Sequence, residues 1–188
     1  LPQYLQNGLL LPVALTGMIM LPGGILNAVV SFASGKLYDK MGPKVLVPLG
    51  FIFTLVGAFL FSRFSTDTSI GYVIFCHLLL MIGIPLSMSP AQSSGLSALP
   101  PHLSTDGSTI INTFQQVIGA ICTALTTCIL QLGQSANAQT SQQAFVNGTH
   151  MSTYFVIGLA ILGLILSFFV RSPQKQVEMT QEIITENN

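Results

Sequence analysis

Charged side chains are scarce in this sequence, and their scarcity excludes several classes of protein. Only 6% of the 188 residues are Asp, Glu, Lys or Arg, whereas half are hydrophobic. An ordinary soluble domain is about 25% charged, and so few charges cannot coat a soluble globule this apolar. A disordered chain would carry more charge and fewer apolar residues. The six basic and six acidic residues balance, so we expect no basic surface for nucleic acid. The class of protein that this composition does fit is an integral membrane protein.

The sequence motifs of membrane-embedded enzymes are also missing. The chain contains no HExxH, no GxSxG and no pair of acidic residues within an apolar stretch, and these are the arrangements that activate water or a nucleophile. The three histidines, His77, His102 and His150, lie in different segments. The three cysteines lie within apolar segments, where small buried side chains are typical. We therefore expect no enzymatic activity, no cofactor and no metal.

Long charge-free stretches dominate what is present. No charged residue occurs in 1–35, 45–62, 68–105 or 107–170. A helix needs about 20 mainly apolar residues to cross the hydrocarbon core, whereas membrane strands show about ten residues of alternating polarity. The apolar runs here are continuous, so the sequence predicts an all-α membrane protein. One transmembrane domain, 1–171, would contain five spans, at about 11–35, 44–62, 70–90, 108–131 and 152–170.

The polar connections predict the orientation of these spans. Residues 132–151 are rich in Gln, Asn, Ser and Thr, which are costly in lipid, so this segment is expected to be a loop. Basic residues concentrate around the hairpin 36–43 and after the last span, at Arg171 and Lys175. The positive-inside rule then places the hairpin and the tail 172–188 in the cytoplasm and the loop 132–151 outside. An odd number of spans and a first residue other than Met suggest a C-terminal part of a longer multi-pass protein of the cell membrane.

Polar side chains gather on one face of three of the spans. The second and last spans are apolar all round, which suits a lipid-facing position. The first, third and fourth spans carry amides and small polar residues at helical spacing. Such a stripe faces a wet cavity or a ligand, or else it forms hydrogen bonds between helices. The candidate cavity residues are Asn27, Met88, Gln92, Asn112, Gln115 and Gln116.

The hairpin 36–43 holds an acid among lysines. Asp39 lies near the C-terminal end of the first span, where the helix dipole disfavours a carboxylate. It therefore requires a partner, and Lys36, Lys40 and Lys44 are within reach along the chain. The positive-inside rule explains why lysines lie at a cytoplasmic hairpin, but it does not explain why an aspartate lies among them. A charge cluster at this place could form in one conformation and break in another.

Three segments resemble a known family. The pattern Gly35-x-Leu37-x-Asp39-Lys40-x-Gly42-x-Lys44 resembles the loop signature of the major facilitator superfamily. The region LSMSPAQSSGLSALPPHLSTDGSTIINTFQQVIGAICTAL (86–125), the opening LPQYLQ and the later Leu-Pro-Gly at 21–23 are similar to its fourteen-span drug:proton antiporter branch (EmrB/QacA type). The resemblance covers about residues 1–130.

The resemblance implies a fold and an activity. The chain would be most of the C-terminal six-helix half of a transporter that alternates between inward-open and outward-open states. It would export drugs or other hydrophobic or cationic small molecules in exchange for protons, together with the N-terminal half of the same polypeptide. The family's gating role carries over to Gly35, Asp39, Lys40, Gly42 and Lys44.

Two other functions stay open at this point. One is a proton-coupled importer of a nutrient from the same superfamily, because the candidate cavity residues do not separate import from export. The other is a non-transporting membrane fragment or scaffold. No acidic residue lies within any predicted span, so proton coupling rests on the resemblance alone, unless His77 carries protons.

Overall fold

The computed structural model describes residues 1–134 and 140–169, and this part of the chain is helical without strands. Five of its helices are long and apolar enough to cross a membrane, which confirms the predicted all-α fold with five spans. Two short turns accompany them. The elements are η1 (Tyr4–Gly8, a π-helical turn), α1 (Val13–Met41), α2 (Pro43–Phe61), α3 (Ile70–Ser97), η2 (Pro101–Leu103), α4 (Ser104–Gln134) and α5 (Ser141–Ser167).

The connection between α1 and α2 is much shorter than the predicted hairpin 36–43. Helix α1 continues through Met41, and Gly42 alone separates it from α2. Gly42 has φ 70° and ψ 169°, a left-handed conformation that glycine adopts without a steric cost. Pro43 then starts α2, where its missing N–H group is not needed. The prediction of a loop was therefore wrong for residues 36–41, which form the last turns of a helix.

The predicted loop 132–151 is also mostly helical. Helix α4 extends to Gln134, and α5 begins at Ser141. The side chain of Thr140 accepts a hydrogen bond from the Gln143 N–H and caps α5. Phe145 and Val146 pack against the apolar core, so tertiary packing stabilises a helix whose composition is polar. Residues 135–139 and the tail 172–188, with Arg171 and Lys175, lie outside the described residues.

Glycines set the closest helix crossings. Helix α3 packs most extensively with α2 and then with α1, whereas α5 packs against α4 and α2. Gly50 and Gly83 lie where α2 crosses α3. The two backbones are so close there that a Cβ atom added to Gly83 would lie 2.6 Å from the Thr54 nitrogen. The same holds where α4 meets α5, because a Cβ atom added to Gly133 would lie 2.7 Å from the Cα atom of Gly148. Small residues at such points allow two backbones to touch.

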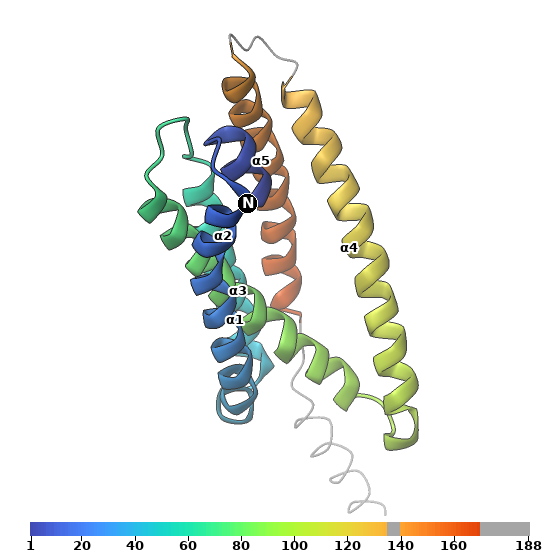
Figure 1. Cartoon of the computed structure of the whole chain (residues 1–188). Helices are drawn as coiled ribbons and strands as arrows, with labels where there is room; N and C mark the ends of the chain where they lie inside the picture. The colour runs from blue at the N-terminus through green and yellow to red at the C-terminus, as the bar shows by residue number, and fades with distance from the viewer. Residues whose placement is uncertain (135–139, 170–188) are drawn as a thin grey trace, which may run out of the picture.

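Helix α4 is the most exposed of the five helices. It packs mainly on α5 and has few contacts with α3, and Figure 1 shows it at one side of the bundle, with the end of α3 running across toward its lower end. Its apolar side chains are largely uncovered, with Phe114 63% and Ile118 55% exposed. An apolar helix face exposed in this way on a membrane protein suits contact with lipid or with further protein.

An aromatic cluster closes one end of the molecule. Tyr4, Phe61, Phe64 and Tyr72 contact one another with ring centroids 4.2–6.0 Å apart, in the range of favourable aromatic pairs. Tyr4 Oη donates a hydrogen bond of 2.6 Å to the Ser65 carbonyl. These contacts tie the N-terminal turn to the connection between α2 and α3.

Candidate functional site

Two of the predicted cavity residues come together between α3 and α4. Gln92 Nε2 donates a hydrogen bond of 3.3 Å to Asn112 Oδ1, although the two residues are twenty positions apart. Helical spacing places Met88 on the same side of α3 as Gln92, and Gln115 and Gln116 beside Asn112 on α4. We call this set the α3–α4 amide surface: Met88, Gln92, Asn112, Gln115 and Gln116.

The amide surface is open rather than enclosed. Asn112 and Gln116 are exposed, and Gln92 and Gln115 are half-buried. Met88 is 46% exposed. A primary amide has two donor hydrogens and an oxygen with two lone pairs, so within the described part of the chain the bond between Gln92 and Asn112 leaves most of their hydrogen-bonding capacity unused. The surface can therefore bind a polar group of a ligand.

Five threonines of α4 do not share this capacity. Each hydroxyl donates a hydrogen bond to the carbonyl four residues earlier in the same helix. Such internal bonds satisfy the hydroxyl and turn its methyl group outward. The amides are therefore the more available hydrogen-bonding groups on this helix. The threonines concerned are Thr109, Thr113, Thr123, Thr126 and Thr127.

Asn27 lies apart from the amide surface. Its Nδ2 atom donates a hydrogen bond of 3.3 Å to the carbonyl of Met81, on α3. Both hydrogen-bonding pairs, Asn27 with Met81 and Gln92 with Asn112, join two helices. Interhelical bonding, one of the two readings of the polar stripe, therefore accounts for these contacts, while a role in a wet cavity stays a prediction.

The residues of the predicted gating loop lie at the junction of α1 and α2. Gly35, Asp39, Lys40 and Lys44 are exposed, and Gly42 is half-buried. Within residues 1–134 and 140–169, Asp39 forms no ion pair, contrary to the expectation that it requires one. Its exposure explains why, since water satisfies the carboxylate. The Lys36 ammonium lies 5.0 Å from the centre of the Phe32 ring, as a cation–π contact.

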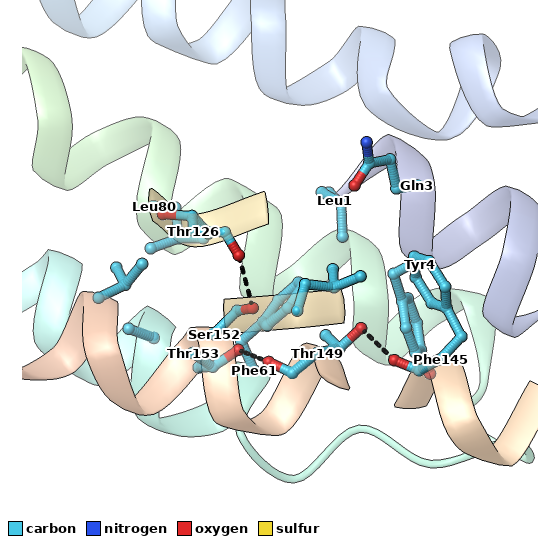
Figure 2. Close-up of a pocket in the computed structure, with 13 residues that line it drawn as sticks. Leu1, Gln3, Tyr4, Phe61, Leu80, Thr126, Phe145, Thr149, Ser152 and Thr153 are labelled. Carbon is cyan, nitrogen blue, oxygen red and sulfur yellow. Dashed lines mark hydrogen bonds between the residues drawn. The ribbon is translucent and has the colours of Figure 1, made fainter. Parts of the chain in front are cut away.

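A cavity of about 250 Å³ lies elsewhere, beside the N-terminal turn (Figure 2). None of the predicted cavity residues lines it. Ser152 Oγ donates to the Thr126 carbonyl, and Thr149 and Thr153 donate to carbonyls within α5, so the wall presents mainly apolar groups. The lining residues are Leu1, Gln3, Tyr4, Ala58, Phe61, Leu80, Thr126, Leu130, Phe145, Thr149, Ser152, Thr153 and Val156.

Sequence reasoning missed this cavity because part of its α5 wall, Phe145 and Thr149, falls in the segment that was expected to be a loop. The spacing of Phe145, Thr149, Ser152 and Val156 is helical, and this signal could have extended the predicted last span. Burial raises the pKa of the Tyr4 phenol at the cavity edge, so the group stays protonated and keeps donating to Ser65. Among the described residues, no three His, Cys, Asp or Glu side chains lie close enough to hold a metal ion.

Comparison with known proteins places this arrangement in a family. The profile of the Major Facilitator Superfamily matches residues 1–123. The lincomycin resistance protein LmrB of Listeria monocytogenes is 42% identical over 179 residues, which are 91% of this chain and 38% of that protein. LmrB of Bacillus subtilis is 41% identical over 180 residues, with the same coverage.

A more distant relative carries a different name. The riboflavin transporter RibZ of Clostridioides difficile is 25% identical over 182 residues, which are 94% of this chain and 40% of that protein. The chain thus spans less than half the length of the curated relatives it matches. With its five membrane-length helices, this multi-pass membrane protein belongs to the major facilitator superfamily.

Proposed function

We propose that the chain is part of a secondary active transporter that exports drugs or similar hydrophobic or cationic small molecules. The observation that carries this proposal is the 42% identity with a lincomycin resistance protein over 91% of the chain. In the proposed mechanism a fourteen-span antiporter exchanges the drug for protons by alternating access. The relatives are much longer than this chain, which supports a complete transporter with a further N-terminal half.

The α3–α4 amide surface is the proposed substrate contact. Gln92 and Asn112 offer donors and acceptors, and Met88, one helical turn from Gln92, adds an exposed flexible side chain. Flexible Met side chains repack around ligands of different shape. A few amides within an apolar wall suit a transporter that accepts several related molecules. Gln115 and Gln116 extend the surface along α4, whereas Asn27 on α1 lies apart from it and bonds to Met81.

The junction of α1 and α2 is the proposed cytoplasmic gate. Asp39 is exposed and unpaired among the described residues, so its charge is available for a partner that another conformation brings near. Gly42 gives the junction its tight turn, and Lys40 and Lys44 flank it. In this proposal the junction and the C-terminal tail face the cytoplasm of the cell membrane, in agreement with the positive-inside rule.

Import is the second candidate function. The relative named as a riboflavin transporter favours a proton-coupled importer of a nutrient, at lower identity than the resistance proteins. A non-transporting membrane scaffold has no observation in its favour beyond the chain's partial coverage of its relatives.

Substitution of the two paired amides tests the substrate contact. In the protein expressed from its complete natural reading frame, Gln92→Leu and Asn112→Leu are expected to change resistance to individual drugs by about fivefold, unequally between drugs. A hydrogen bond contributes about 1 kcal/mol, which corresponds to about that factor. Growth inhibition by a panel of lincosamides and lipophilic cations measures the effect.

The matched control is Thr113→Val, one position from Asn112. Its hydroxyl is already bonded to the Thr109 carbonyl, so the substitution should leave the drug profile unchanged. If both leucine variants reach the membrane in normal amounts and keep the wild-type profile, the α3–α4 amide surface does not contact the substrate.

A further inference from the structure

Helices α1 and α3 lie unusually close where Asn27 reaches across. Gly23 of α1 faces His77 and Met81 of α3, and a Cβ atom on Gly23 would collide with the His77 ring and lie 3.1 Å from Met81 Cγ. One helical turn further along α1, Asn27 is half-buried and donates its amide hydrogen to the Met81 carbonyl. The crossing therefore combines a close backbone approach with one directional hydrogen bond.

The carbonyl that Asn27 reaches has lost its usual partner. In an α-helix the carbonyl of residue 81 accepts a hydrogen bond from the N–H of residue 85, but residue 85 is proline and has no N–H. Missing bonds of this kind are the main cause of bends in helices. An unpaired carbonyl within a membrane is also costly. Asn27 thus supplies from another helix the hydrogen bond that Pro85 removes.

The segment beyond Pro85 carries the amide surface. As far as Ser87, in the turn around Pro85, α3 is held tightly against α2 at Gly50. Its C-terminal part diverges from α1 and α2 and runs toward the N-terminal part of α4 (Figure 1), where Gln92 bonds to Asn112. Since α3 and α4 share few other contacts, the direction of residues 88–97 decides whether these two amides meet.

We propose that Asn27 is a positioning residue for the amide surface. By bonding to the carbonyl that Pro85 leaves open, it fixes the direction in which α3 continues and holds Gln92 opposite Asn112. Asn27 then acts on the substrate through α3 and does not contact it. The inference rests on the proposed function only in treating the amide surface as the substrate contact.

Cysteine crosslinking in membranes tests this geometry without any transport. All native cysteines of the protein expressed from its complete reading frame, including Cys76, Cys122 and Cys128, are replaced by alanine, and the pair Gln92→Cys with Asn112→Cys is introduced. A short bifunctional thiol reagent should crosslink this pair readily when Asn27 is present. In Asn27→Leu the rate should fall at least about fivefold, and Asn27→Gln, which keeps an amide, should recover part of it.

A second cysteine pair separates positioning from general loosening. The pair Thr126→Cys with Ser152→Cys joins α4 to α5, where Ser152 bonds to the Thr126 carbonyl, and its crosslinking should not depend on Asn27. Equal rates for the first pair with and without Asn27 overturn the proposal. An equal fall for both pairs also overturns it, because Asn27 would then stabilise the whole bundle. If Asn27→Leu does not reach the membrane, Asn27→Ser decides by the same comparison.

The variant Pro85→Ala tests whether Asn27 acts through the Met81 carbonyl. Alanine restores the N–H at position 85 and satisfies the Met81 carbonyl from within α3. In that background Asn27→Leu should change the crosslinking rate of the first pair by less than about twofold. A full effect of Asn27→Leu in both backgrounds would show that Asn27 does not act through this carbonyl. Because no substrate is present, these results are independent of whether the protein exports drugs.

Discussion

Replacing Gly50 by valine is expected to remove almost all folded protein from the membrane. A Cβ atom at this position would lie 2.7 Å from the Gly83 carbonyl oxygen and closer still to the Ser87 nitrogen. Both are backbone atoms of α3, so no side chain can rotate away. Overpacking costs about 1–3 kcal/mol even where neighbours can yield, and about 1.4 kcal/mol is a factor of ten. We therefore expect less than about one tenth of the wild-type yield of monodisperse protein after extraction with detergent.

The partner glycine and a matched control sharpen this prediction. Gly83→Val should have the same effect, because its Cβ atom would lie 2.6 Å from the Thr54 nitrogen. Gly158→Val on α5 adds the same side chain where no atom lies within 4 Å, and it should give normal yield. Normal yield for both Gly50→Val and Gly83→Val would mean that α2 and α3 do not cross at these glycines.

Replacing Asp39 by asparagine is expected to abolish export while leaving the amount of protein in the membrane unchanged. The carboxylate is exposed and forms no ion pair among the described residues, so its loss should not weaken this fold. It also lies near the C-terminal end of α1, where the helix dipole disfavours a negative charge. An acid in this position is therefore better explained by a bond made in another conformation.

The size of the effect follows from the bond that would be lost. A charge-assisted hydrogen bond contributes about 1.5–3 kcal/mol, which corresponds to about 10–100-fold in the balance between two conformations. Initial rates of energised efflux, normalised to membrane protein, measure it. The control is Asp67→Asn, an equally exposed aspartate in the connection between α2 and α3, which should keep wild-type efflux. Normal efflux by Asp39→Asn would remove the gating role from the junction of α1 and α2.

The five helices could be predicted from the distribution of charge, but their ends could not. Apolar runs free of charge mark the part of each helix that lipid surrounds, and the chain shows them plainly. Outside those runs a helix can continue in polar sequence. Ser141 to His150 is helical because Thr140 caps it and because Phe145 and Val146 pack on the core. Tertiary contacts of this kind are invisible to a rule based on composition.

The candidate site was predictable in its residues and only partly in its contacts. Helical spacing placed Gln92 on one face of its helix and Asn112 on one face of the next, and the structure brings these faces together. The partner of Asn27 depends on how α1 and α3 are aligned in space, which no local pattern specifies. Pro85 leaves the carbonyl of residue 81 without its usual helical donor, but the sequence does not show which residue supplies one.

The most direct test of the account is energised efflux from cells that lack their own drug exporters and express the complete natural reading frame. Cells are loaded with ethidium or with labelled lincomycin, energised, and compared with cells that carry the empty vector. The account predicts faster efflux of at least one of these compounds, abolished by a protonophore. Efflux equal to the empty vector for both compounds, with the protein present in the membrane, would contradict the assignment as a drug exporter.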